Sequence, residues 1–386
     1  MKVSLRDDLR ALPRPAWILF GGTFINRFGS FVLPFLVLYL TRAGYSATEA
    51  GAAMAIYGCG HLFASILGGH LADRLGRRNT IGVSMFGSAA AMIALAQAHG
   101  FPAIAAAVFA TGTLTELYRP ASYALVADLV PQERRVIAYG VYRLAVNLGF
   151  AAGPAMAGFL ADKSFGLLFA GDAATSVIYG MIALAFLPHG MRGFGRDERV
   201  GEAFRAAVRD TPFLLLLIAT LGVTAIDFQS GSTFPLFVKS LGYATSTYGV
   251  LLSINGMLFV AFELLITSFV RRFRPQPVIA FGYLLSGVGF ALNLFARTIP
   301  QLAGTVVVWT LGEMISSPVA GAYAAHIAPE QYRGRYMGLL MTMWSLGLIF
   351  GPLIGTWSFA HNPEILWIGC GIGGICTALL LLTTHH

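Results

Sequence analysis

The sequence predicts an all-α integral membrane protein with twelve transmembrane helices in two six-helix bundles and both termini in the cytoplasm. Three observations support this fold class. First, the 386 residues are 56% hydrophobic and only 11% charged, whereas soluble domains carry roughly 25% charged residues. Second, twelve apolar runs divide the chain, and each has the length typical of a spanning helix. Third, glycines and prolines recur at a fixed interval between the two halves of the chain.

The apolar runs are bounded by proline, glycine and charged residues. They cover residues 16–40, 50–72, 79–98, 102–127, 136–161, 166–188, 212–239, 247–270, 277–297, 300–328, 335–360 and 364–384. The long charged connection predicts three parts, an N-terminal bundle (1–188), a cytoplasmic linker (189–211) and a C-terminal bundle (212–386). Within the linker, Glu202–Arg209 is expected to form a short surface helix. His385 and His386 resemble the remnant of a purification tag.

The positions of the basic residues set the predicted orientation. Nineteen of the 26 Lys and Arg residues lie in the N-terminus and in alternate connections, four lie in the opposite connections, and three lie inside spans. Cytoplasmic loops are enriched in basic residues, so both termini are predicted to be cytoplasmic. This distribution accounts for the net charge of +8 without a nucleic acid partner. Met1–Arg14 is charged and amphipathic, which is not the pattern of a cleavable signal peptide.

The two halves repeat one another at an offset of 198 residues. The matching pairs are Pro120 and Pro318, Pro131 and Pro329, Gly140 and Gly338, Gly149 and Gly347, Gly153 and Gly351, and Pro154 and Pro352. At an offset of 201, Asn26 matches Asp227 and Pro34 matches Pro235. Parallel repeats of this kind form transporter bundles whose substrate sites lie near the middle of the membrane.

One charged turn between the second and third runs carries a specific pattern. Its patterned positions are Gly69, Asp73, Arg74, Gly76, Arg77 and Arg78. The turn resembles the signature loop of the major facilitator superfamily, which implies that fold and a transport activity. An ordinary positive-inside loop would explain the arginines but not Asp73 and Gly76 at this spacing. The resemblance also implies that Asp73, Arg77 and Asp128 form a latch in the N-terminal bundle, although Asp128 is also explained as a solvated charge at a helix end.

A second motif lies in the fifth span. Asn147 opens it, and it continues with Gly149, Gly153, Pro154 and Gly158. It is similar to the glycine–proline motif in helix five of the family's drug antiporters, which favours an exporter. Small residues let helices approach closely and proline bends them. These positions are therefore expected to serve as a hinge, as close packing, or as both.

Ionisable residues inside spans are costly and mark functional sites. Arg27, Glu116, Asp227 and Glu313 lie near the middle of their spans, counted at ~1.5 Å per residue. Arg119 lies three residues after Glu116, where it can pair with it, either as a structural ion pair or as part of a site. Burial away from any cation favours the protonated form of a carboxyl group. Asp227 and Glu313 have no basic neighbour in their own helices, so this argument applies to them. These two acids, together with Glu116, are the predicted proton-coupling residues.

Helices seven and ten extend the resemblance. Thr310–Pro318, which contains Glu313, and Asp227–Pro235 are similar to acid-bearing segments of the LmrP-type multidrug/proton antiporters. The helix-five acid of that group is replaced here by Tyr142. The residues expected to line the substrate cavity are Arg27, Asn26, Arg119, Asn147, Gln229 and Tyr142.

These patterns favour a proton-coupled exporter of amphipathic or cationic small molecules that works by alternating access in the cytoplasmic membrane. A lipid or glycolipid flippase of the same fold is the alternative, and a membrane receptor or chaperone without transport activity is a third reading. The sequence shows no nucleophile–base pair, phosphate-binding loop or metal-ligand spacing, so no enzymatic activity, metal or cofactor is expected beyond the proton gradient. The expected partners are the substrate and the lipid bilayer, and the resemblance implies a monomer.

Overall fold

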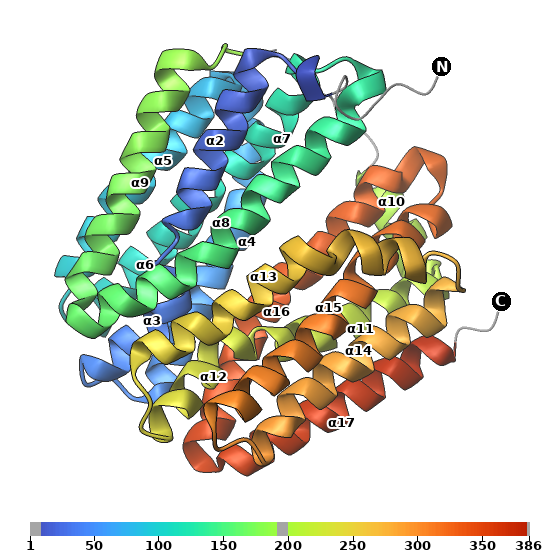
Figure 1. The fold of residues 1–386 in the computed structure, drawn as a ribbon. Helices are drawn as coiled ribbons and strands as arrows, with labels where there is room; N and C mark the ends of the chain where they lie inside the picture. The colour runs from blue at the N-terminus through green and yellow to red at the C-terminus, as the bar shows by residue number, and fades with distance from the viewer. Residues whose placement is uncertain (1–8, 191–199, 384–386) are drawn as a thin grey trace. The chain divides into compact units, whose positions relative to one another are not determined.

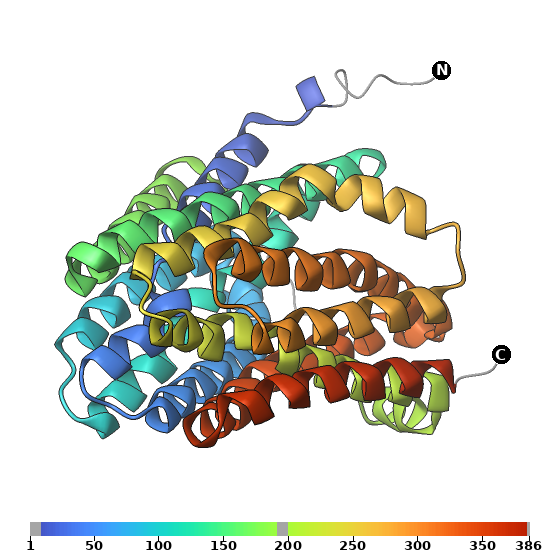
Figure 2. The same cartoon turned by 60° about the horizontal axis from the view of Figure 1, so that its bottom comes forward.

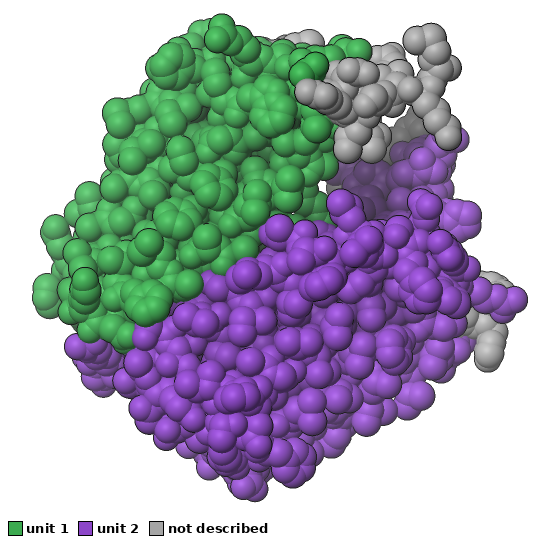
Figure 3. Space-filling model, viewed as in Figure 1, with its two compact units in different colours: residues 1–33, 56–195 green, residues 34–55, 196–386 purple. Residues whose placement is uncertain are grey.

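The computed structural model describes residues 9–190 and 200–383, and all regular structure among them is helical (Figure 1, Figure 2). Most of the N-terminal segment Met1–Arg14, linker residues 191–199 and the terminal pair His385-His386 therefore lie outside the described residues. The chain divides into two compact units (Figure 3). Unit 1 contains residues 1–33 and 56–195, and unit 2 contains residues 34–55 and 196–386. The predicted bundle 1–188 thus includes residues 34–55, which group here with unit 2.

In the described part of the chain, unit 1 contains seven α-helices, and most of them contribute to one apolar core. They are α2 (Arg14–Phe28), the later part of α4 (Ala47–Leu75), α5 (Arg77–Gln97), α6 (Phe101–Glu116), α7 (Tyr118–Leu129), α8 (Arg135–Lys163) and α9 (Phe165–Phe186). The turn η1 (Gln132–Arg134) precedes α8. Apolar side chains of α2, α5, α7, α8 and α9 form the largest part of the core.

Unit 2 contains the remaining helices. They are most of α3 (Val32–Arg42), the beginning of α4, α10 (Val200–Arg209), α11 (Thr211–Asp227), α12 (Gln229–Ser240), α13 (Thr245–Val270), α14 (Pro275–Ala291), η2 (Leu292–Leu294), α15 (Ile299–Ile327), η3 (Glu330–Tyr332), α16 (Arg333–His361) and α17 (Pro363–Leu382). The core joins α10, α11, α14, α15, α16 and α17. Tyr248 of α13 donates a hydrogen bond to the carbonyl oxygen of Pro34 at 3.1 Å, which attaches α3 to this unit.

Eleven segments of the described chain are long and apolar enough to cross a bilayer. Helix α4 is bent by 41° between Ala47–Ser65 and Leu67–Leu75, and it gives a twelfth candidate if both parts form one span. Eleven spans and one bent pair agree in order with the twelve predicted runs. The count of twelve and the cytoplasmic side of the termini stay predictions.

Three spans are broken near their middle. The first is interrupted between α2 and α3, the fourth between α6 and α7, and the seventh at Phe228 between α11 and α12. A proline inside a helix cannot donate its backbone hydrogen bond and its ring crowds the carbonyl four residues earlier. Pro34 and Pro120 therefore disturb the chain at Ser30 and Glu116, next to the first two breaks. These breaks leave backbone groups for side chains to satisfy.

Candidate functional site

Three charged residues of unit 1 meet beside the turn between α4 and α5. Arg77 forms an ion pair with Asp73, and its Nε lies 3.6 Å from Oδ2 of Asp128. Gly76 adopts a φ of 87° at this turn, a conformation that costs glycine little but strains other residues. The structure thus brings together the residues of the expected latch, whereas the latch function itself stays a prediction.

The end of the sixth span packs on the same turn. Nη2 of Arg78 lies 2.7 Å from Nε2 of His189. Gly190 has a φ of 71°, and a Cβ atom there would lie 2.5 Å from Cγ of Arg77. By contrast, Gly69 has open space around the position of a Cβ. The close contacts are therefore made by Arg77 and Arg78, at the start of α5, and not by Gly69. Arg74 lies in the last helical turn of α4.

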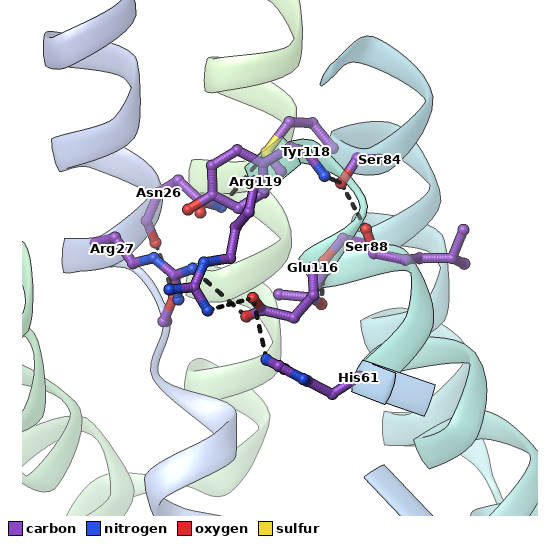
Figure 4. A network of polar contacts seen from close by, with 12 residues as sticks. Asn26, Arg27, His61, Ser84, Ser88, Glu116, Tyr118 and Arg119 are labelled. Carbon is purple, nitrogen blue, oxygen red and sulfur yellow. Dashed lines mark hydrogen bonds and ion pairs between the residues drawn. The ribbon is translucent and has the colours of Figure 1, made fainter. Parts of the chain in front are cut away.

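A polar network in unit 1 is centred on Glu116 (Figure 4). Nη2 of Arg27 lies 3.4 Å from Oε1 of Glu116, and Nη1 of Arg119 lies 3.1 Å from Oε2. Nε2 of His61 lies 3.6 Å from the same Oε2. The Glu116 side chain is buried, whereas Arg119 is 47% exposed. The predicted pairing of Glu116 with Arg119 is confirmed, and Arg27 and His61 extend it to three helices besides α6.

Serine side chains stabilise the break that places Glu116. Ser84 of α5 donates a hydrogen bond to the carbonyl oxygen of Leu114 and accepts one from the amide nitrogen of Tyr118 at 3.1 Å. Ser88 is 2.9 Å from the hydroxyl of Thr115. The contacts of Ser84 satisfy backbone groups that the break would otherwise leave unpaired. The Glu116 carboxylate is consequently held at a defined position.

The glycine motif of α8 positions Arg27 from the other side. A Cβ atom on Gly149 would lie 2.7 Å from Cβ of Arg27 and 2.8 Å from the amide nitrogen of Phe28. A Cβ atom on Gly153 would lie 2.6 Å from the carbonyl oxygen of Phe28. The two helices therefore touch through their backbones, as small-residue motifs allow. Gly149 and Gly153 thus make the close helix contacts that a packing role requires, while Pro154 and Gly158 are buried further along α8. The hinge role stays a prediction.

Asp172 of α9 is a buried carboxyl that the sequence prediction omitted. Its Oδ2 accepts hydrogen bonds from the amide nitrogens of Phe31 and Val32 at 3.1 and 3.2 Å. These amides open α3, where the helix dipole favours a negative group. Gly29, in the same break, lies against Thr175 of α9. Asp172 thus caps the second half of the broken first span from another helix.

Two carboxyl groups of unit 2 lie within electrostatic range of each other. They belong to Asp227, the last residue of α11, and Glu313 of α15. Asn255 of α13 donates a hydrogen bond to Oε2 of Glu313 at 3.1 Å. Oδ1 of Asp227 is buried without a hydrogen-bond partner, and the side chain of Ser286 lies beside this carboxyl. Among the described residues, neither carboxyl forms an ion pair with Lys, Arg or His.

The glycines of α16 pack next to Asp227 as those of α8 pack next to Arg27. A Cβ atom on Gly347 would lie 2.2 Å from Oγ1 of Thr224, and one on Gly351 would lie 2.6 Å from the carbonyl oxygen of Ala225. Gln229 bridges the break after α11, because its Nε2 donates to the carbonyl oxygens of Ala225 and Gly351 at 2.8 and 2.9 Å. The repeat in the sequence is therefore also a repeat in packing.

The family model described as Major Facilitator Superfamily matches residues 19–276 and 231–386. The chain belongs to the Major Facilitator Superfamily. It is accordingly a multi-pass membrane transporter and not an enzyme, as predicted. Among residues 9–190 and 200–383, no group of three or more His, Cys, Asp or Glu side chains is placed to hold a metal ion.

Relatives and solved structures agree with this assignment. Over 352 residues the transporter is 28% identical to the uncharacterized MFS-type transporter YqjV of Bacillus subtilis, covering 88% of this chain and 85% of YqjV. It is 24% identical over 379 residues to the quinolone resistance protein NorA of Staphylococcus aureus, covering 96% of each chain. A POT family transporter in complex with 5-aminolevulinic acid shares the fold, with a TM-score of 0.83, 16% identity and 96% coverage of both chains. The nucleoside transporter NupG has a TM-score of 0.84 at 16% identity, covering 97% of this chain and 100% of NupG.

Three residues expected to line the substrate cavity of this transporter are buried within their own units in this structure. Asn26 contacts Sδ of Met85 through Nδ2, and Tyr142 packs in the core of unit 1. Gln229 is 4% exposed, and its amide is used in the bridge between α11, α12 and α16. Asn147 is half-buried on α8. Contact of Arg27, Arg119 and Asn147 with a substrate stays a prediction.

Proposed function

We propose that this transporter is a proton-coupled exporter of amphipathic, cationic small molecules in the cytoplasmic membrane. It works as a monomer by alternating access and uses the proton gradient without a cofactor. Three features support the proposal. They are Asp227 and Glu313, called here the acid pair of unit 2, the glycine–proline motif of α8, and the similarity to NorA, whose name describes quinolone resistance. The acid pair is the observation that carries it.

The acid pair suits a site that holds either protons or a cation. Two ionised carboxylates on adjacent helices repel strongly where the dielectric constant is low. Burial without a counter-ion is also costly for each of them. Asp227 and Glu313 lack a basic partner among the described residues of unit 2, so a proton or a cationic substrate must supply the missing charge. Binding of one then excludes the other, which couples substrate release to proton uptake.

Glu116 is assigned a different role from the one predicted. Its carboxylate already contacts Arg27 and Arg119. An acid that is matched by two guanidinium groups has no need of a substrate cation or a transferable proton. We therefore place proton exchange at Asp227 and Glu313 and regard Glu116 as an ion-pairing residue.

Transport by the purified protein in proteoliposomes tests the proposal. With an imposed pH gradient, the wild type is expected to move the cationic dye ethidium against its gradient. The Glu313→Gln variant is expected to lose this proton-driven accumulation, because the amide cannot carry a proton through the cycle. The Glu263→Gln variant changes an acid of α13 that is not part of the acid pair, and it should keep the proton-driven accumulation. Unchanged pH-driven transport by Glu313→Gln would remove the acid pair as the coupling site.

A further inference from the structure

The Glu116 network contains more positive than negative groups. Two guanidinium groups, those of Arg27 and Arg119, share the single carboxylate of Glu116. His61 lies 3.6 Å from the same carboxylate and adds a positive charge whenever it is protonated. Among the described residues, no other carboxylate forms an ion pair with either arginine. The network therefore carries an excess of at least one positive charge.

Asp172 is the other acid in electrostatic range of Arg27, but its charge is used elsewhere. Its Oδ2 accepts from the amide nitrogens of Phe31 and Val32. These groups are the positive end of α3, which holds a carboxylate by hydrogen bonds and by its dipole. The excess positive charge of the Glu116 network is consequently not balanced by Asp172 at contact distance.

The arginines retain donors that Glu116 does not occupy. Arg119 contacts Glu116 through Nη1, and its side chain is 47% exposed. Arg27 contacts Glu116 through Nη2, and its Nε is buried without a hydrogen-bond partner. The hydroxyl of Tyr118, whose ring lies 5.5 Å beneath the Arg27 guanidinium, is also buried without a partner. Figure 4 shows both guanidinium groups on the same side of Glu116.

We propose that Arg119 and Arg27 form a subsite for the carboxylate of an amphipathic substrate. This inference rests on the proposed export function and narrows it, since preferred substrates then carry an acidic group in addition to any cationic one. A guanidinium presents parallel N–H donors that match a carboxylate. Excess charge inside a span is costly unless a partner compensates it. Glu116 orients the two guanidinium groups, and the substrate carboxylate completes the charge balance.

A matched pair of substrates tests the subsite. The probes are a zwitterionic quinolone with a free carboxylate and its methyl ester, which keeps the ring system and amine but lacks the negative charge. Binding is measured by fluorescence titration of the purified protein, and transport by uptake into proteoliposomes. For Arg119→Gln, the dissociation constant and the half-saturating concentration of the acid are expected to rise by about tenfold or more, as for loss of a charge-assisted hydrogen bond. The ester should change by less than about twofold.

Two further variants separate recognition from folding. Arg119→Lys keeps the charge but loses the fork of donors, so it should recover part of the affinity for the acid. Arg143→Gln removes an arginine of α8 for which no contact with Glu116 is seen, and it should leave both probes unaffected. Unaltered binding of the ester to Arg119→Gln also shows that this variant is folded.

The outcomes distinguish this inference from the proposed function. Equal losses for acid and ester, or no preference of the wild type for the acid, would overturn the carboxylate subsite while proton-driven ethidium transport still stands. Failure of the wild type to transport any probe with a pH gradient would overturn the proposed function. In that case the binding titration still decides whether Arg119 recognises the carboxylate.

Discussion

The two units share a scaffold but treat buried charge in opposite ways. In unit 1 the acid of the fourth span is matched by Arg27 and Arg119. In unit 2, Asp227 and Glu313 lie within electrostatic range of each other and have no ion-pair partner among the described residues. In both units a glycine-rich helix packs through its backbone next to the charged residue of the first or seventh span. The helix contacts are therefore alike in the two repeats, whereas the buried charged residues differ and give each unit a different chemistry.

One pair of equivalent positions shows how the acids differ. At the repeat offset of 198 residues, Asp172 of α9 corresponds to Cys370 of α17. Asp172 caps α3 at the break of the first span. Cys370 lies in electrostatic range of Asp227, at the break of the seventh span. The break of the first span is therefore capped by an acid of a neighbouring helix, whereas the break of the seventh span directly follows an acid of the broken helix itself.

The largest expected difference in stability concerns Glu116. Glu116→Gln leaves Arg27 and Arg119 without their carboxylate and should destabilise the protein by about 3 kcal/mol. This is the lower end of the range for removing one partner of a buried ion pair, because Arg119 is half exposed. Glu313→Gln removes no ion pair and should cost less. Unfolding in detergent, followed by tryptophan fluorescence, measures both variants. Equal losses would contradict the distinction between a paired acid and an unpaired one.

A smaller effect is expected at Asp172. Asp172→Ala leaves the amides of Phe31 and Val32 buried without an acceptor, at a cost of about 1–3 kcal/mol. Asp172→Asn keeps one acceptor oxygen and should recover part of this loss. Cys370→Ala is the matched change in unit 2, and it should cost less than Asp172→Ala. The same unfolding measurement gives the loss of stability of the three variants. If Cys370→Ala were the most destabilising, the proposed difference between the two helix breaks would be wrong.

A last set of variants tests the helix contacts that the two units share. Gly149→Ala and Gly351→Ala each place a Cβ against backbone atoms of the facing helix, at 2.8 and 2.6 Å respectively, and should destabilise by about 1–3 kcal/mol. Gly140→Ala and Gly338→Ala lie on the same two helices in open space. These controls should be neutral or stabilise by up to about 1 kcal/mol, because alanine favours a helix. Similar values for all four would show that close helix approach does not matter.

Much of the architecture could be predicted because it follows from hydropathy and repeats. Apolar runs require helices in a bilayer, and the equal offset of Gly149 with Gly347 indicated two related units. The pairing of Glu116 with Arg119 followed from their spacing of three residues. The residues of the turn at Gly76 could be grouped with Asp128 because the motif resembled that of a known family.

Other parts depended on contacts between distant segments. Asp172 is an acid inside an apolar run, so the rule that identified Glu116 applied to it as well. Its role remained hidden because the amides it caps are about 140 residues away in sequence. Gln229 was expected to face substrate, but the break after α11 exposes a carbonyl that its amide satisfies. A helix break leaves backbone groups that need hydrogen-bond partners, and the periodicity of the sequence does not show which side chain supplies them.

The division of the chain between the units has a practical consequence. Residues 34–55 belong to unit 2, yet they lie between two segments of unit 1, and α4 contributes to both. A gene cut within the linker would therefore produce a first fragment carrying a piece of the other unit, and a second fragment lacking it. Separately expressed halves should recover a native assembly only when both fragments are made together in the same cell.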